Sequence, residues 1–157
     1  MINKRYLVVM SLIAAVSACD SQRTITTAQQ KVVKVYNHIP TGFENSRWQF
    51  VDIKGKSMSS GDLAPFVRFV QGELTGFTGC NNFMGRYQRD GMWLNISAFK
   101  SEKQPCDSLS AQQTLVTSAL MQTRSIRVIK STDNLVFLDG QSKVVAELKA
   151  VKMKEGS

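Results

Sequence analysis

The chemistry that the sequence specifies most clearly is that of its three cysteines, Cys19, Cys80 and Cys106. Cys19 ends the tetrapeptide Val-Ser-Ala-Cys, which matches a bacterial lipobox. In such a motif the thiol is acylated and the cysteine becomes the first residue of the mature chain. Cys19 is therefore the predicted lipidation site. The alternative is an ordinary cleaved signal with a chance cysteine at this position.

Residues 1–18 have the features of a lipoprotein signal peptide. Lys4 and Arg5 precede an apolar run over residues 6–16, and small residues follow it. The run is shorter than the ~20 residues that a transmembrane helix needs. We expect a protein of the bacterial cell envelope, lipid-anchored to a membrane and facing the periplasm. Asp20, directly after the cysteine, favours the inner membrane by resemblance to enterobacterial lipoproteins, and the choice between inner and outer membrane stays open.

The remaining cysteines, Cys80 and Cys106, form an even pair in a compartment where disulfides persist. A bridge between them is the favoured interpretation. Two reduced, buried thiols are the main alternative. A redox or metal role is weaker, because no C-x-x-C spacing occurs and there are too few further ligands for zinc.

The charge of the chain excludes some partners and favours others. The formal net charge is +8, and removing residues 1–18 takes away two positive charges and no negative ones. A basic surface suits anionic lipid headgroups or other acidic envelope polymers. Nucleic acid is not an expected partner, because the Lys and Arg residues are scattered and no basic block interleaves with aromatic residues.

Residues for catalysis are not grouped in the sequence. His38 is the only histidine and precedes Pro40 in a polar segment, so a surface role is expected. Asp90 falls in a predicted turn and Glu147 on the outward face of a predicted strand. No Gly-rich phosphate loop occurs. We therefore expect no enzyme, no catalytic residue, no metal and no cofactor.

The chain is organised as a leader, a tether, one domain and a tail. Residues 19–46 are expected to form the tether; residues 32–36 within it are compatible with a strand or a helix. The domain covers residues 47–151, and residues 152–157 form a flexible tail. Trp48 is a predicted core residue of the first domain strand. Asp90-Gly91 between β-prone runs predicts a hairpin.

A helix is expected after residue 109, and strands over residues 125–130, 135–138 and 144–150. Ser110 and Gln113 have the spacing of a capping box. The apolar stripe of the helix comprises Ala111, Leu115, Val116, Ala119 and Leu120. In the last strand, one face comprises Val144, Ala146, Leu148 and Ala150, with Glu147 and Lys149 on the other.

Residues 74–87 are rich in glycine and asparagine, as a tight crossing between two strands requires. Gly76, Gly79 and Gly85 permit close approach of the chain or a positive φ, and Asn81 tolerates a left-handed backbone. The motifs Gly79-Cys80-Asn81, Gly85-x-Tyr87 and Asp90-Gly91-x-x-Leu94-x-Ile96, with Cys106 downstream, resemble the META domain, a family that includes heat-shock lipoproteins of the HslJ-like type. Gly91 belongs to the same motif set. The resemblance covers residues 47–150.

The order of elements predicts an α+β domain, in which one main helix packs against a curved, open-barrel-like antiparallel sheet. The resemblance implies the same fold. It also implies an HslJ-like, non-enzymatic stress-response or binding module with an envelope protein or peptide as a possible partner. The alternative is a pilotin-like chaperone, which binds an amphipathic peptide of a secretion-system subunit. Exposed apolar residues would support it; Phe83, Met84 and Met121 are the candidates, although burial of Phe83 and Met84 in the core is favoured.

Overall fold

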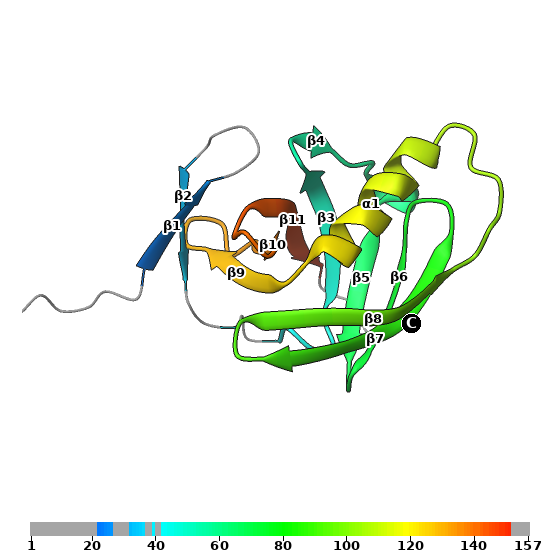
Figure 1. The fold of residues 1–157 in the computed structure, drawn as a ribbon. Helices are drawn as coiled ribbons and strands as arrows, with labels where there is room; N and C mark the ends of the chain where they lie inside the picture. The colour runs from blue at the N-terminus through cyan, green and yellow to red at the C-terminus, as the bar shows by residue number, and fades with distance from the viewer. Residues whose placement is uncertain (1–21, 27–31, 37–38, 40–41, 152–157) are drawn as a thin grey trace, which may run out of the picture.

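The computed structural model describes residues 22–26, 32–36, 39 and 42–151. These residues form an 11-stranded antiparallel sheet and one α-helix, as expected for the predicted α+β fold (Figure 1). The strands are β1 (Gln22–Thr26), β2 (Val32–Tyr36), β3 (Arg47–Ile53), β4 (Lys56–Ser57), β5 (Phe66–Val70), β6 (Glu73–Phe77), β7 (Asn82–Asp90), β8 (Trp93–Ser101), β9 (Ser125–Ile129), β10 (Leu135–Leu138) and β11 (Val144–Val151). Helix α1 spans Ser110–Gln122, and a short 3-10 helix, η1, spans Gly61–Leu63.

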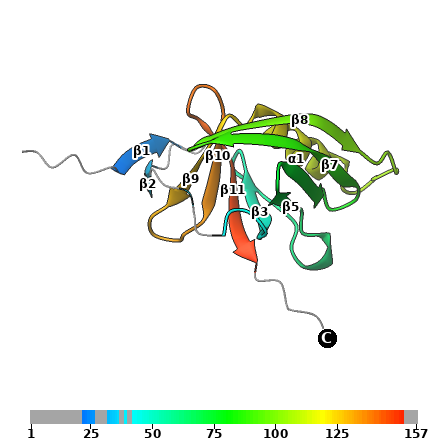
Figure 2. The same cartoon turned by 90° about the horizontal axis from the view of Figure 1, so that it is seen from below.

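The sheet curves back on itself into a ring. Its strands follow the order β9-β10-β11-β3-β5-β6-β7-β8, and β8 then pairs again with β9 through Trp93 and Ser125. Helix α1 lies beside the curved sheet and shares its core (Figures 1 and 2). It buries Val116, Ala119 and Leu120 there. The inner face of the ring is therefore filled. A second, smaller buried cluster lies on the other face of β9, β10 and β11 and comprises Ile129, Val136, Leu138 and Val144.

The core is built on aromatic residues that alternate along the strands. Trp48 of β3 is buried, as predicted, and its Nε1 donates a hydrogen bond to the Phe43 carbonyl at 2.9 Å. Phe69 stacks on Phe43 with ring centroids 4.7 Å apart and meets Tyr87 edge-on at 5.0 Å. Such pairs add to the stabilisation from buried apolar area.

The segment of residues 19–46, expected to be a tether, carries two strands. β1 and β2 form an antiparallel hairpin, and β2 adds to β9 through the pairs Val35 with Ile129 and Tyr36 with Val128. Residues 32–36 are thus a strand. Phe43 is part of the buried core upstream of residue 47. Cys19, Asp20, His38 and the tail of residues 152–157 lie outside the described residues.

The start of α1 differs from the predicted capping box. Leu109 is the N-cap, no side chain caps the helix, and Ser110 is already helical. The Gln113 side chain turns instead to Asn81. Ala111 is exposed, so it is not part of the buried stripe. The spacing of Ser110 and Gln113 is compatible with a local cap. In the folded domain, however, the Gln113 side chain binds Asn81, which is distant in the sequence.

The last strand alternates less regularly than predicted. Val144, Val145 and Ala146 are all buried, and Ala150 is exposed. The register with β3 shifts after Glu147, and such an irregularity rotates the following residues relative to the partner strand. A regular alternation of inward and outward residues, as assumed from the sequence, does not predict this register shift.

The β7–β8 hairpin is confirmed. Asp90 pairs with Trp93 across the turn, and Gly91 has a φ of 54°. Glycine adopts this left-handed φ at little cost, which is why an Asp-Gly pair favours a hairpin turn.

Gly76 occupies an inward position of β6 at which a side chain has no room. A Cβ there would lie 2.2 Å from the Phe66 carbonyl oxygen and 2.3 Å from Cζ of Phe83. We expect Gly76→Ala to lower the free energy of unfolding by about 3 kcal/mol, measured by urea denaturation. The matched control is Gly91→Ala, whose Cβ would meet nothing within 4 Å; its left-handed φ costs about 1 kcal/mol. Equal losses in the two variants would contradict the steric argument.

Candidate functional site

The structure joins Cys80 to Cys106 in a disulfide, with the two Cα atoms 6.0 Å apart. Cys80 lies in the turn between β6 and β7, and Cys106 lies in the connection between β8 and α1. The bond therefore holds the start of the helix region against the sheet.

Asn81, beside the disulfide, is fully buried and all its polar atoms have partners. Its Nδ2 donates to the Gln104 carbonyl at 3.0 Å and to Oε1 of Gln113 at 2.7 Å. Its Oδ1 accepts from the Gln104 backbone N–H at 3.0 Å. One side chain thus joins the turn, the connection after β8, and α1.

Gly79 makes room for a second glutamine of the helix. Its φ is 100°, and a Cβ would lie 2.0 Å from Nε2 of Gln112. That Nε2 donates to the Thr78 carbonyl at 3.0 Å, and the Gln112 Oε1 accepts from the Ser59 backbone N–H at 2.9 Å. Because these groups bond one another, residues 78–81 form a structural junction rather than a ligand site.

Tyr87 connects β7 to the segment before β3. Its side chain is buried, and its hydroxyl donates to Oε1 of Glu44 at 2.5 Å. Burial, followed by the hydrogen bond and the negative charge of Glu44, raises the pKa of Tyr87 to about 12. The phenol is therefore neutral at physiological pH and acts as a structural donor.

The described residues contain no group of three or more His, Cys, Asp or Glu residues that could hold a metal ion. In the same part of the chain, no helix is long and apolar enough to cross a membrane.

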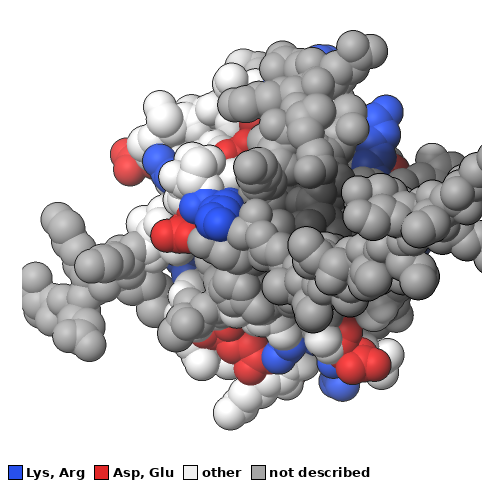
Figure 3. Space-filling view, turned by 90° about the vertical axis from the view of Figure 1, so that its left-hand side faces the viewer, with Lys and Arg blue, Asp and Glu red and all other residues white. Residues whose placement is uncertain are grey.

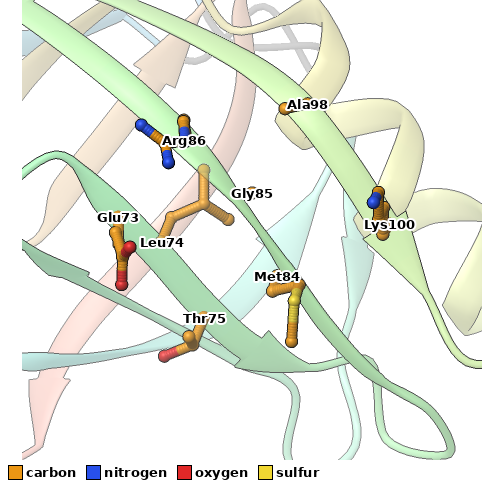
Figure 4. A pocket seen from close by; sticks show the side chains of 8 residues that line it. All are labelled: Glu73, Leu74, Thr75, Met84, Gly85, Arg86, Ala98 and Lys100. Atoms are coloured by element: carbon orange, nitrogen blue, oxygen red, sulfur yellow. The ribbon is translucent and has the colours of Figure 1, made fainter.

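A hollow of about 280 Å³ lies on the outer face of β6, β7 and β8 (Figure 4). The register between β7 and β8 shifts between Met84 and Arg86, which leaves Gly85 without a single opposite partner. A Cβ on Gly85 would lie 3.0 Å from the Ser97 carbonyl oxygen, so β8 can approach only because this residue is glycine. Ala98 has a φ of 49° at this bulge. The lining comprises Glu73, Leu74, Thr75, Met84, Gly85, Arg86, Ala98 and Lys100.

The hollow combines cations with an exposed apolar side chain. Arg86 and Lys100 line it from β7 and β8, and Met84, 60% exposed, lies directly opposite Lys100 in the register (Figure 4). Such a combination can hold an anionic group and an apolar group together. Gly85 is one of the glycines predicted to shape this region, whereas Met84, for which burial in the core was favoured, is exposed. Arg86 and Lys100 were not predicted, because only the strand register brings them together.

A second, wider hollow lies between the tip of the β7–β8 hairpin and the segments around residues 124 and 140. Its volume is about 600 Å³, and Trp93, which is 64% exposed, lines it. The end of the molecule beside β1, β2 and β9 shows acidic and basic side chains mixed over its described atoms (Figure 3). Among the described atoms of this view, neither sign of charge gathers into a patch of its own.

The comparisons with known proteins agree with this geometry. The family model of the META domain matches residues 41–152. The chain belongs to the META domain family. A solved structure described as the NMR structure of a protein from Burkholderia xenovorans is 14% identical, with a TM-score of 0.55 over 74% of this chain and 90% of that one. A second NMR structure is 16% identical, with a TM-score of 0.53 over 69% of this chain and 92% of that one. At these identities the likeness shows the fold alone. No curated protein matches the META-domain chain significantly.

Removing the disulfide should destabilise the META domain in an oxidising buffer. With the two cysteines 26 positions apart in the sequence, Cys80→Ser should lower the free energy of unfolding by about 3 kcal/mol, because the unfolded chain regains conformational freedom. Urea denaturation with and without dithiothreitol measures this. In reductant the variant and the wild type should be nearly equal. A difference of the same size in both buffers would contradict a role for the bond.

The pKa of Tyr87 predicts an alkaline limit to stability. The raised pKa means that the folded protein favours the neutral phenol, so this contribution is intact below about pH 10 and is lost as the pH rises towards 12. We expect the stability difference between the wild type and Tyr87→Phe to shrink from pH 8 to pH 11 in urea denaturation. Other titrating groups are common to both proteins and cancel. A constant difference would contradict the shift.

Proposed function

We propose that this META-domain protein is a lipid-anchored, non-enzymatic binding module of the bacterial cell envelope, held at a membrane through Cys19 and facing the periplasm. The observation that carries the proposal is the hollow over Gly85, which offers two cations, Arg86 and Lys100, beside the exposed Met84. The arrangement suits reversible binding rather than bond-making chemistry.

Two further features support an envelope location. The lipobox that ends at Cys19 follows a signal-peptide pattern. The bond between Cys80 and Cys106 is of a kind that persists outside the cytosol. Membership of the META family adds the HslJ-like stress-response role as part of the proposal.

A pilotin-like chaperone is the second candidate, and the exposed apolar residues favour it. Met84 and Trp93 are both more than half exposed, and Met121 is 42% exposed on α1. Phe83, by contrast, is buried in the core. An amphipathic peptide could use such exposed residues as contacts. Asp20 favours retention in the inner membrane. Such retention would count against a pilotin, because a pilotin must reach the outer membrane.

Acylation of Cys19 can be tested directly in bacterial cells. We expect the wild type to incorporate labelled palmitate and to sediment with membranes, and Cys19→Ala to lose both properties. Cys80→Ser serves as the matched control and should keep the label. Label retained by Cys19→Ala, or absent from the wild type, would refute the anchor.

A photoreactive amino acid at position 84 distinguishes the two candidates in intact cells. Capture of the tail of a secretin subunit, confirmed by mass spectrometry, would favour the pilotin. The same amino acid at position 56, an exposed position of β4 that does not line the hollow, controls for random collisions.

A further inference from the structure

The outer face of the sheet around the hollow carries an excess of positive charge. The register places five cationic side chains on outward positions of β3, β5, β7, β8 and β11. They are Arg47, Arg68, Arg86, Lys100 and Lys149. Four acids also lie on these strands and on β6 outside the core. Asp52 of β3 and Glu147 of β11 are cross-strand partners of each other, and Asp90 lies at the tip of the β7–β8 hairpin. Glu73 is the one acid among the residues that line the hollow, and Glu102 at the edge is already bonded to Asn82. The part of the face around the hollow therefore attracts an anion.

Two of these cations lie side by side, and no acidic partner of either occurs in the part of the chain that the structure describes. Arg47 and Arg68 are direct cross-strand partners, and Nε of each is buried without a hydrogen-bond partner. Like charges placed opposite each other destabilise a sheet, and a buried N–H without an acceptor costs more. Arg47 also stacks on the Phe66 ring at 3.8 Å, which fixes its position. An anion bound nearby would offset the repulsion between the two guanidinium charges.

The hollow lies on the same cross-strand row. Arg68 pairs with Thr75, Thr75 with Met84, and Met84 with Lys100. Thr75, Met84 and Lys100 all line the hollow. The row thus leads from the arginine pair into the hollow.

Arg86 and Lys100 can share one ligand. Met84 is the cross-strand partner of Lys100, and Arg86 lies two residues further along β7, past the register shift, so both cations line the same hollow. Their long side chains can meet around a single phosphate. Glu73 pairs with Arg86 in the register, yet among the described residues the Arg86 side chain makes no ion pair or hydrogen bond. Its guanidinium is available to a ligand.

We propose that this hollow binds a phosphate group attached to an apolar chain, as an anionic phospholipid presents. Arg86 and Lys100 hold the phosphate, since guanidinium and ammonium groups both bind phosphate oxygens strongly. The adjoining apolar part lies over the exposed thioether of Met84. The choice of a lipid rests on the proposed anchoring, which would hold the domain at a membrane that carries anionic headgroups.

The test uses the purified full chain in a neutral detergent, labelled with ¹³C in the methionine methyl groups. The Met84 signal is the one that disappears in Met84→Leu. We expect it to shift on titration with dihexanoylphosphatidylglycerol and to remain in place with the zwitterionic dihexanoylphosphatidylcholine. The Met121 signal, on α1, is the internal control and should not move.

Variants and a third probe make the test specific. Arg86→Gln and Lys100→Gln should each weaken the titration about tenfold, the effect of losing one charge-assisted hydrogen bond. Lys56→Gln, an exposed lysine on β4 away from the hollow, should leave it unchanged. Inorganic phosphate should bind more weakly than the lipid. Equal affinity for the two would overturn the apolar contact and point to free phosphate.

A static Met84 signal, equal shifts with both lipids, or equal effects of Lys56→Gln and Arg86→Gln would overturn the site. Binding here needs no acyl group on Cys19, so failure of this titration and failure of palmitate labelling in cells are separate results.

Discussion

The buried amide of Asn81 is the interaction on which the helix side of the domain depends. It satisfies polar groups of the connection after β8 and of α1 at the same time. Because a buried amide without partners is costly, this arrangement is stable only when all three segments are in place. The disulfide between Cys80 and Cys106 spans the same gap covalently. Its contribution of about 3–4 kcal/mol is a large share of the 5–15 kcal/mol typical of a domain.

The register shift between β7 and β8 has a different role from the structural junction at residues 78–81. Gly85 lets the partner strand come close, and Ala98 accepts a left-handed φ that costs an ordinary residue about 1 kcal/mol. Local strain of this size tends to be kept where a surface has a use. Here it accompanies the hollow on the outer face, between Arg86 and Lys100.

The two faces of the sheet thus divide the roles within the domain. The inner face and α1 form one continuous apolar core, in which Tyr87 is the main ionisable group and is held neutral by its surroundings. The outer face beside β6, β7 and β8 carries exposed charged side chains, Arg86 and Lys100 among them. An arrangement of this kind favours recognition of an anionic partner, because a rigid ring presents the cations without having to fold around the ligand.

The sequence by itself determined the elements whose causes are local. The alternation around Trp48, the Asp90-Gly91 turn and the glycine-rich crossing at residues 74–87 each depend on neighbouring residues, and the fold class followed from their order. Only the tertiary structure decided which residues meet. Gln113 looked like a helix cap and became a partner of Asn81, since a side chain with several possible partners is placed by packing. The hollow likewise could not be predicted from the sequence. Its two cations, Arg86 and Lys100, come together through a one-residue shift in strand register, and contacts across the whole sheet set that register.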